Sequence, residues 1–260
     1  MYLSKLKSGI KDFTSSVQRI PQCLPDSHCY LCQQPTQRLI CEVCEQDCLF
    51  FNTPVLPDNL LLWPPIKKGL VSGRYTSVHA CSYYQWPMDH LINQYKNGHP
   101  QLTQTLADWF VAYALPSEPF LPDCILPVPT SSWRFARRRY HQTLLLANEI
   151  GRRLSIPVHA NWASRRSFQR KQQSLGRRER LNNLKRAFAL SKDPLPSRVA
   201  ILDDVVTTGA TAAALSNMIY SAYPETSVAL WTLAITPAKA DPGALVSGQI
   251  RQQRVLLQQY

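Results

Sequence analysis

Short apolar runs alternate along this sequence with stretches in which apolar residues recur at helical spacing. The clearest run is Val199–Leu202, whose four apolar residues predict a buried strand. From Leu215 to Ala222 apolar residues recur at helical spacing and predict a helix. Two acidic residues and a short loop separate the run from the helix. The stretch is therefore predicted to be a strand–loop–helix unit.

Further segments of both kinds precede and follow this unit. The predicted strands are Tyr75–Tyr84, Asp123–Leu126 and Val228–Ala234, and the predicted helices are His90–Lys96, Leu102–Leu115 and a segment from about Gln142 to Leu154. Strands that alternate with helices predict an α/β fold with a mainly parallel sheet, and ligands of such sheets bind beyond the carboxyl ends of the strands. The proline- and leucine-rich segment Thr53–Lys68 has no clear period and predicts a linker or a packed irregular segment.

At the N-terminus, apolar residues from Leu3 to Ile20 recur every three or four positions and predict an amphipathic helix over residues 1–22. This helix can pack on the protein or touch a membrane surface. Lysines interrupt any signal-peptide core, and no run approaches the ~20 apolar residues of a membrane span. We therefore expect a cytoplasmic protein without a transmembrane segment, with attachment to the inner membrane face left open by this helix.

Two cysteine pairs with metal-ligand spacing lie close together in the sequence. Cys29-x-x-Cys32 and Cys41-x-x-Cys44 are separated by eight residues, and cytosolic thiols stay reduced. Four thiolates can hold one tetrahedral Zn²⁺ and stabilise a segment too small for its own core. The alternative is a set of reduced, unbound cysteines. Alternative ligands are Cys23 and Cys48, which flank the array, whereas Cys81 and Cys124 are predicted core residues.

The net charge is +12, and the excess is concentrated in one segment. Residues 134–186 contain fifteen Lys and Arg against only Glu149 and Glu179. Such a segment attracts polyanions, although a solvated basic surface is the alternative. Aromatic residues within and beside it would suit stacking on bases or packing against the sheet, and these are Trp133, Phe135, Tyr140, Trp162 and Phe168. With 45% hydrophobic residues, the chain is not predicted to be disordered as a whole.

The acidic pair Asp203-Asp204 and the loop after it carry the clearest candidate chemistry. A loop that enters a helix offers unpaired N–H groups and the positive end of the helix dipole to a phosphate. The threonines of Val205–Thr211 add hydroxyl donors, and Gly209 lets the backbone approach closely. The carboxylates can accept hydrogen bonds from sugar hydroxyls or hold a hydrated cation. The unit therefore predicts a phosphosugar site. The alternative is a buried strand whose acids begin a turn; a P-loop enzyme would need G-x-x-x-x-G-K-[ST], which the sequence lacks.

The run from Val199 to Thr211 resembles the signature of type I phosphoribosyltransferases, which bind 5-phosphoribosyl-1-pyrophosphate (PRPP) with Mg²⁺. The resemblance implies that Asp203 and Asp204 contact the ribose hydroxyls and hydrated Mg²⁺ as the catalytic pair. It also implies that the loop holds the 5′-phosphate. The implied PRPP-binding residues are Asp203, Asp204, Val205, Val206, Thr207, Thr208, Gly209, Ala210 and Thr211.

Other motifs, in their order along the chain, resemble the ComF competence-protein family. They are the four-cysteine knuckle, Lys96-x-Gly98, Pro127-Val128-Pro129, Arg139-Tyr140-His141-Gln142 and Gln172…Leu175…Arg180…Asn183…Phe188 before the acidic pair. The resemblance implies a type I phosphoribosyltransferase fold, with helices on both faces of the sheet, plus a small zinc-ribbon-like module. The predicted division is a helix at 1–22, the zinc knuckle and linker at 23–70, the phosphoribosyltransferase-like domain at 71–240 and a tail at 241–260.

By position, the resemblance also supplies candidates around the pyrophosphate. The pyrophosphate loop candidates are Val128, Pro129, Thr130 and Arg139, and the candidates from a flexible hood over residues 165–183 are Arg178, Arg180 and Asn183. This chain departs from the family in three places. Thr130–Trp133 stands where relatives often carry His-Pro, Tyr140-His141 stands where they carry a glycine and an asparagine, and Asp58–Trp63 lacks the second cysteine ribbon of some members.

The resemblance implies a role in natural transformation, in which the protein binds PRPP and handles incoming single-stranded DNA together with DNA-uptake machinery proteins. One alternative is an active phosphoribosyltransferase, a pentosyl-transferring glycosyltransferase of nucleotide metabolism with an unknown acceptor. A second is a non-catalytic scaffold stapled by zinc. We find no motif for a covalent nucleophile, and pentosyl transfer needs none.

Overall fold

The computed structural model describes residues 28–54, 56–116, 121–130, 141–165 and 187–236. The predicted N-terminal helix, Cys23, the basic run 134–139, most of the predicted hood and the tail lie outside these residues. Contacts divide the chain into two compact units, Met1–Glu45 and Gln46–Tyr260. Each unit is described by itself below.

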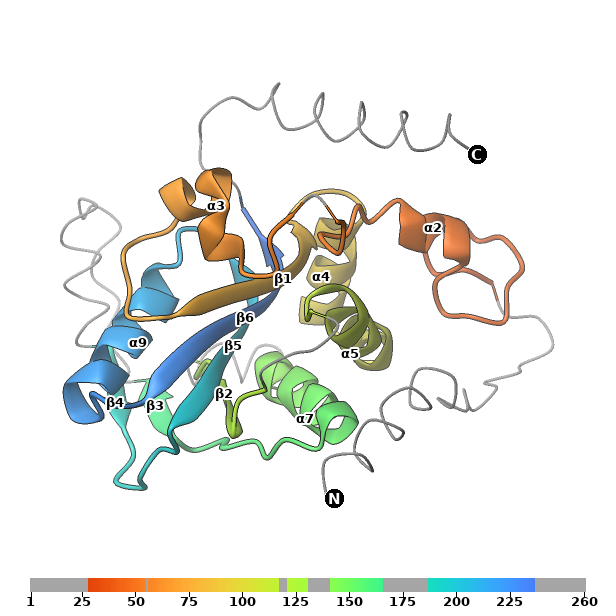
Figure 1. Cartoon of the computed structure of the whole chain (residues 1–260). Helices are drawn as coiled ribbons and strands as arrows, with labels where there is room; N and C mark the ends of the chain where they lie inside the picture. Colours follow the sequence, from red (N-terminus) through yellow and green to blue (C-terminus); the bar gives the residue numbers. More distant parts are fainter. Residues whose placement is uncertain (1–27, 55, 117–120, 131–140, 166–186, 237–260) are drawn as a thin grey trace, which may run out of the picture. The chain divides into compact units, whose positions relative to one another are not determined.

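The second unit is built on a four-stranded sheet of order β1-β6-β5-β2 (Figure 1). Its strands are β1 (Ser77–Tyr83), β2 (Cys124–Pro127), β5 (Arg198–Val206) and β6 (Ser227–Ile235). All three strand pairs are parallel, as the alternation of strands and helices predicted. The two inner strands, β5 and β6, are the longest and carry nearly continuous apolar runs, which is typical of strands buried on both faces.

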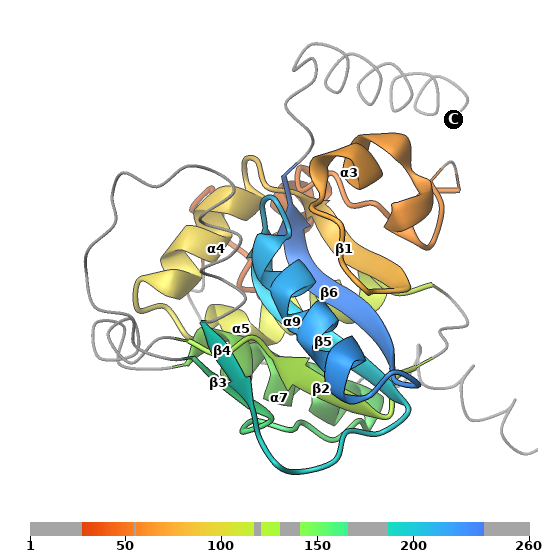
Figure 2. The same ribbon diagram turned by 90° about the vertical axis from the view of Figure 1, so that its left-hand side faces the viewer.

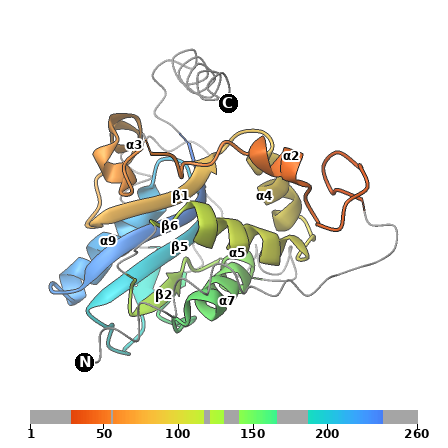
Figure 3. The ribbon, with the colours of Figure 1, turned by 45° about the vertical axis from the view of Figure 1, so that its right-hand side comes forward.

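Helices cover both faces of this sheet. Helices α5 (Leu102–Tyr113) and α7 (Gln142–Leu154) pack on one face, where α5 contacts β1 and β6 and α7 contacts β2 and β5 (Figure 3). Helix α9 (Ala210–Ala222) packs on the opposite face and contacts β5 (Figure 2). Helix α4 (Met88–Lys96) connects β1 to α5 and contacts α5. The α/β class with a parallel sheet between two helical layers is thereby confirmed.

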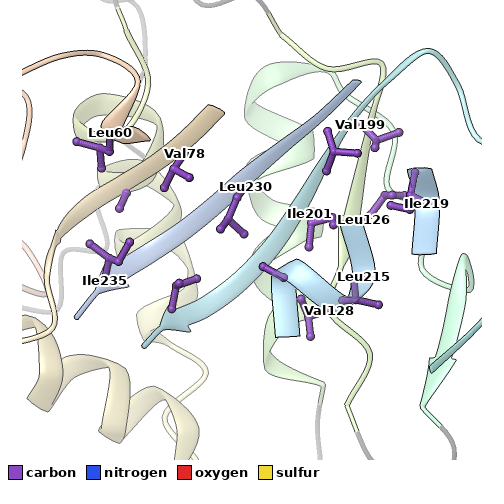
Figure 4. Packing of buried hydrophobic residues seen from close by; sticks show 14 of the residues in the cluster. Leu60, Val78, Leu126, Val128, Val199, Ile201, Leu215, Ile219, Leu230 and Ile235 are labelled. Carbon is purple, nitrogen blue, oxygen red and sulfur yellow. The ribbon is translucent and has the colours of Figure 1, made fainter. Parts of the chain in front are cut away.

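The apolar cluster beneath α9 joins strands that are far apart in the sequence. Side chains from all four strands meet those of α9, among them Leu126, Ile201, Leu215, Ile219 and Leu230 (Figure 4). Burying a side chain of this size stabilises the fold by roughly 1.5–3 kcal/mol relative to leaving it exposed. The cluster therefore ties α9, and with it the loop before the helix, to the centre of the sheet.

The segment predicted as a linker or as irregular packing contains a 3-10 helix, η1 (Leu60–Leu62), and a short helix, α3 (Pro64–Gly69). Leu60 and Ile66 are buried in the apolar cluster. Asn59 joins η1 to β1, because its Oδ1 accepts hydrogen bonds from the N–H groups of Leu61 and Val78 and its Nδ2 donates to the carbonyl of Thr76. The segment thus belongs to the packed structure of the second unit.

A second, two-stranded sheet was not predicted. Strands β3 (Ala163–Arg165) and β4 (Phe188–Leu190) pair antiparallel, with Arg165 opposite Phe188. Their short length gave no periodic signal in the sequence. The pair brings together Arg165 and Phe188, which are 23 positions apart in the chain.

Candidate functional sites

The acidic pair lies within strand β5, which continues past both acids to Val206. The sequence placed the acids directly after the strand, and the structure places them at its carboxyl end, with Asp203 opposite Thr232 of β6. Asp203 Oδ1 accepts a hydrogen bond of 2.9 Å from the N–H of Asp204. Asp204 is buried, with only 9% of its surface exposed. Both acids stand at the edge of the sheet where ligands of parallel α/β proteins bind.

Lys96 is a partner of the acidic pair that the sequence did not identify. Its Nζ lies 2.8 Å from Asp204 Oδ1, and the two side chains are only 17% and 12% exposed. Lys96 is the last residue of α4 and belongs to the Lys-x-Gly motif. A motif in the sequence cannot show which acid its lysine reaches, since Lys96 and Asp204 are brought together only by the packed sheet.

Gly209 turns the chain from β5 into α9. Its φ of +68° is left-handed, a conformation that glycine adopts without a steric penalty. A Cβ at this position would lie 2.8 Å from Leu70 Cδ2. The N–H of Val71 donates a 2.8 Å hydrogen bond to the carbonyl of Thr208, so residues 70 and 71 form a wall behind the loop. Leu70 is the last residue of the segment 23–70 that the sequence assigned to the zinc knuckle and linker, and Val71 is the first residue of the predicted phosphoribosyltransferase-like domain.

The N-terminus of α9 keeps backbone donors available. The N–H of Ala210 is 3.4 Å from Thr208 Oγ1, and the first helical bond runs from Ala213 N–H to the carbonyl of Gly209. Among the described residues, the N–H groups of Thr211 and Ala212 have no acceptor. Thr207 and Thr208 are exposed beside them. This arrangement of free N–H groups and hydroxyls at a helix N-terminus suits an anion.

The proposed pyrophosphate loop follows β2 at the same edge of the sheet. Pro127 is the last residue of β2 and lies opposite Leu202, and the N–H of Val128 donates a 2.9 Å hydrogen bond to the Leu202 carbonyl. The sequence predicted that the strand ends at Leu126, and the structure extends it by one residue. Pro127 fits into the strand because its pairing with Leu202 uses the N–H of Val128 and needs no N–H from the proline.

Trp162 has a structural role at this loop. Its side chain is fully buried, and its Nε1 donates a 2.9 Å hydrogen bond to the carbonyl of Pro127. Of the two uses left open for this aromatic residue, packing is the one observed. The other four aromatic residues of that set, Trp133, Phe135, Tyr140 and Phe168, lie outside the described residues.

His141 links the β2 loop to α7. Its Nδ1 accepts a 3.0 Å hydrogen bond from the N–H of Leu144 and so caps the helix, while its Nε2 lies 3.4 Å from the N–H of Thr130. Burial lowers the pKa of His141, which favours the neutral ring needed for the cap. Arg139, Arg178, Arg180 and Asn183, the remaining candidates for the pyrophosphate loop and the hood, lie outside the described residues.

The four predicted cysteines of the first unit form one cluster. The Sγ atoms of Cys29, Cys32, Cys41 and Cys44 all lie within 4.8 Å of one another. The backbone explains this convergence, because the N–H of Cys29 bonds to the carbonyl of Gln34 and the chain then returns through Arg38, which pairs with Glu42 and Glu45. Cys48 belongs to the second unit and is not part of this group.

The chemistry of this donor set fits a soft divalent cation. Burial alone would raise the pKa of Cys29, but backbone N–H groups of both cysteine pairs, including that of Cys41 at 3.4 Å from the Sγ, lower it to about 6. Burial, reinforced by the neighbouring thiols, raises the pKa of Cys44. A bound cation such as Zn²⁺ would allow all four groups to be thiolates at neutral pH. The cluster can therefore hold a structural zinc ion.

Within the part of the chain that the structure describes, no helix has the length and apolar character needed to cross a membrane.

The fold and the two sites define a class of protein: a parallel α/β unit with an acidic strand end beside a helix N-terminus, preceded by a four-cysteine knuckle. No family model matches the chain. Similarity to proteins named competence protein F and DNA utilization protein YhgH nevertheless supports membership of the ComF family.

Two relatives illustrate this similarity. Competence protein F of Haemophilus influenzae is 39% identical over 117 residues, which cover 44% of this chain and 51% of the relative. DNA utilization protein YhgH of Salmonella typhi is 29% identical over 214 residues, which cover 80% of this chain and 90% of the relative. The chain thus matches about half the length of the Haemophilus protein and most of the Salmonella protein.

Proposed function

We propose that the second unit binds PRPP together with Mg²⁺ at the carboxyl edge of β5. One observation carries this proposal: an acidic pair with a buried Asp204 lies near the carboxyl end of a central parallel strand, and a left-handed glycine leads from that strand into the free N–H groups of a helix. A phosphosugar carries hydroxyls that can bind to the acidic pair and a phosphate that can bind to the N-terminus of the helix. The resemblance of this stretch to the phosphoribosyltransferase signature supports the same ligand.

Each part of the site would have a distinct role. Asp203 and Asp204 would accept hydrogen bonds from the ribose hydroxyls, and through water they would hold Mg²⁺, a hard cation that prefers oxygen ligands. The loop Thr207–Thr211 would donate N–H and O–H hydrogen bonds to the 5′-phosphate. Mg²⁺, when bound, neutralises charge on the pyrophosphate oxygens. Residues 128–130 would line the pyrophosphate subsite.

Calorimetry with PRPP and Mg²⁺ tests this proposal directly. We expect the wild-type chain to bind PRPP, and we expect Asp203→Asn with Asp204→Asn to weaken binding at least about tenfold, because hydrogen bonds to charged groups contribute roughly 1.5–3 kcal/mol each. Glu225→Gln is a matched control, since it removes one exposed carboxylate after the far end of α9. Absence of PRPP binding by the folded wild-type chain would contradict the proposal and leave the scaffold alternative.

We further propose that the protein serves DNA utilisation by handling single-stranded DNA. The names of the relatives, a competence protein and a DNA utilization protein, support this role, and so does the excess of fifteen Lys and Arg over two Glu in residues 134–186. The affinity of the protein for single-stranded DNA can be measured by the fluorescence anisotropy of a labelled oligonucleotide over a series of salt concentrations. Binding through phosphates should weaken with salt, with a logarithmic slope of about −0.7 for each phosphate contact. A flat response, or no binding at low salt, counts against direct handling of DNA.

The two remaining alternatives are separated by a turnover measurement. Release of pyrophosphate from PRPP in the presence of a nucleobase or another acceptor would establish pentosyl transfer. Binding of PRPP without release would favour a ligand-regulated DNA-handling protein. Asp203→Asn serves as the control for release that does not depend on the site.

A further inference from the structure

The ion pair between Lys96 and Asp204 gives the acidic site an internal cation. The two charged groups are 2.8 Å apart, and both side chains are mostly buried. Burial reduces screening by water and salt, so this pair interacts more strongly than a surface ion pair. In the described structure, the ammonium of Lys96 therefore already neutralises the charge of Asp204, one of the two carboxylates proposed to bind the ribose and the metal.

The backbone beneath Lys96 is held in place. The carbonyl of Lys96 accepts a 3.0 Å hydrogen bond from Gln142 Nε2, and the carbonyl of Gln142 accepts one of 2.7 Å from the hydroxyl of Tyr95. Tyr95 and Gln142 are almost fully buried. The end of α4 is thus fastened to the start of α7, and the flexible side chain is the part of Lys96 that can change partner.

Gly98 follows two residues later and leaves room beside this end of α4. Its φ is +109°, and an added Cβ would have no heavy atom within 4 Å. The Cβ position of Gly98, two residues after Lys96, is therefore unoccupied.

We propose that Lys96 is a positioning residue that controls the order of binding: it occupies Asp204 and opposes a divalent cation until a polyanionic ligand offers the ammonium another partner. With Lys96 in place, the pair of acids and the lysine together carry a charge of only −1, which is a weak attraction for a cation that gives up its water reluctantly. The pyrophosphate group of PRPP supplies anionic oxygens to which the ammonium can transfer, because a buried cation cannot be left without a counter-charge. Asp204 then becomes free for the ribose and the metal. This inference rests on the proposed function for the identity of the polyanion, but not for the competition between Lys96 and a cation.

Binding of Mn²⁺ alone tests that competition without PRPP. Mn²⁺ takes oxygen ligands like Mg²⁺, and the electron paramagnetic resonance signal of the free ion reports its concentration. The full chain, with its cysteine cluster loaded with zinc beforehand, is titrated as wild type, Lys96→Met and Lys96→Arg. We expect Lys96→Met to bind one Mn²⁺ at least about tenfold more tightly than the wild type. The reason is that one adjacent positive charge changes the equilibrium of cation or proton binding to a carboxylate by about tenfold or more. Lys96→Arg keeps the charge and should bind Mn²⁺ as weakly as the wild type.

A double variant identifies the metal ligand. Adding Asp204→Asn to Lys96→Met should return Mn²⁺ binding to the wild-type level, because the freed carboxylate is then absent. Equal Mn²⁺ affinity of wild type and folded Lys96→Met overturns the proposal. If Lys96→Met does not fold, as judged by its circular dichroism spectrum, Lys96→Gln makes the same comparison with a polar side chain that can still donate a hydrogen bond to Asp204.

PRPP then separates this inference from the proposed function. The wild type should bind Mn²⁺ and PRPP together, each tightening the other, and PRPP should tighten Mn²⁺ binding less in Lys96→Met than in the wild type. Tight Mn²⁺ binding by Lys96→Met without any PRPP binding by the wild type would refute the proposed ligand and retain Lys96 as the competing cation. If the wild type binds PRPP and Lys96→Met has the same Mn²⁺ affinity as the wild type, the proposed ligand is retained and the competition between Lys96 and a cation is refuted.

Discussion

At the scale of single residues, the candidate site depends on a few positions where another amino acid would change the backbone conformation or the charge. Gly209 combines a left-handed φ with a close neighbour, and Asp204 combines burial with an ion pair to Lys96. Both properties come from residues distant in sequence: Leu70 closes the space beside Gly209, and α4 supplies the lysine. The site is therefore sensitive to changes that a sequence motif alone would not include.

Gly209→Ala should destabilise the chain by about 1–2 kcal/mol through its backbone conformation alone, with a further loss from the contact between the new Cβ and Leu70. Gly98→Ala is the matched control, because Gly98 also has a positive φ but has open space around its Cβ position. Urea unfolding of both variants measures the difference. If Gly98→Ala proves as costly as Gly209→Ala, the contact with Leu70 does not contribute.

At the scale of elements, residues in the short connections hold the strands and helices around the site in place. His141 caps α7 and reaches toward Thr130 at the end of β2, and Asn59 ties η1 to β1. Residues 70 and 71, after α3, form the wall of the loop before α9. The contacts of His141 and of residues 70 and 71 lie at the carboxyl ends of β2 and β5, whereas those of Asn59 lie at the amino end of β1.

The cap on α7 predicts a pH dependence of stability. Burial holds the pKa of folded His141 below its usual value of 6.5, so between those two values the unfolded chain binds more protons than the folded chain. The contribution of His141 to stability is therefore fully present above about pH 6.5 and is lost as the pH falls toward the folded pKa. Its Nδ1 must also release Leu144 when it is protonated.

His141→Asn keeps an oxygen acceptor for the cap and removes the titration. We expect the free energy of unfolding to fall less between pH 7.5 and pH 5.5 in this variant than in the wild type, as measured by urea denaturation at both pH values. His28→Asn, at an exposed histidine of the first unit, should behave as the wild type does. Partial burial also lowers the pKa of His79, so some loss should remain in His141→Asn. An unchanged pH dependence would show that His141 does not control it.

At the scale of the whole molecule, the two units are stabilised by different means. The second unit buries an apolar cluster around a parallel sheet, whereas the described part of the first unit spans 18 residues, 28–45, around four cysteines. A segment of that size needs a metal or another cross-link to stay folded.

Removal of zinc should therefore unfold the first unit and spare the second. Hydrogen exchange after treatment with a chelator should show loss of protection at the N–H groups of Cys29 and Tyr30, which are bonded across the knuckle, with protection of β5 and β6 unchanged. Cys41→Ser should lower the zinc content per chain, and Cys48→Ala should leave it near one ion. Loss of zinc in Cys48→Ala would show that a different set of cysteines binds the ion.

Much of this architecture was predictable because its cause is local in the sequence. The runs Val199–Leu202 and Val228–Ala234 predicted β5 and β6, and the helical spacing from Leu215 to Ala222 predicted most of α9. The two Cys-x-x-Cys pairs predicted the cysteine cluster. The pair β3–β4 and the helices η1 and α3 were missed, since elements of three to six residues are too short to show a period.

The sequence by itself determined the order of strands and helices, the four converging cysteines and the acid–loop–helix unit, because each follows from residue types at short spacing. Only the tertiary structure decided that Lys96 meets Asp204, that Leu70 and Val71 stand behind Gly209, and that Trp162 holds the carbonyl of Pro127. These contacts join residues 35 to 139 positions apart in the chain, and their geometry exists only after the parallel sheet has brought its carboxyl ends together.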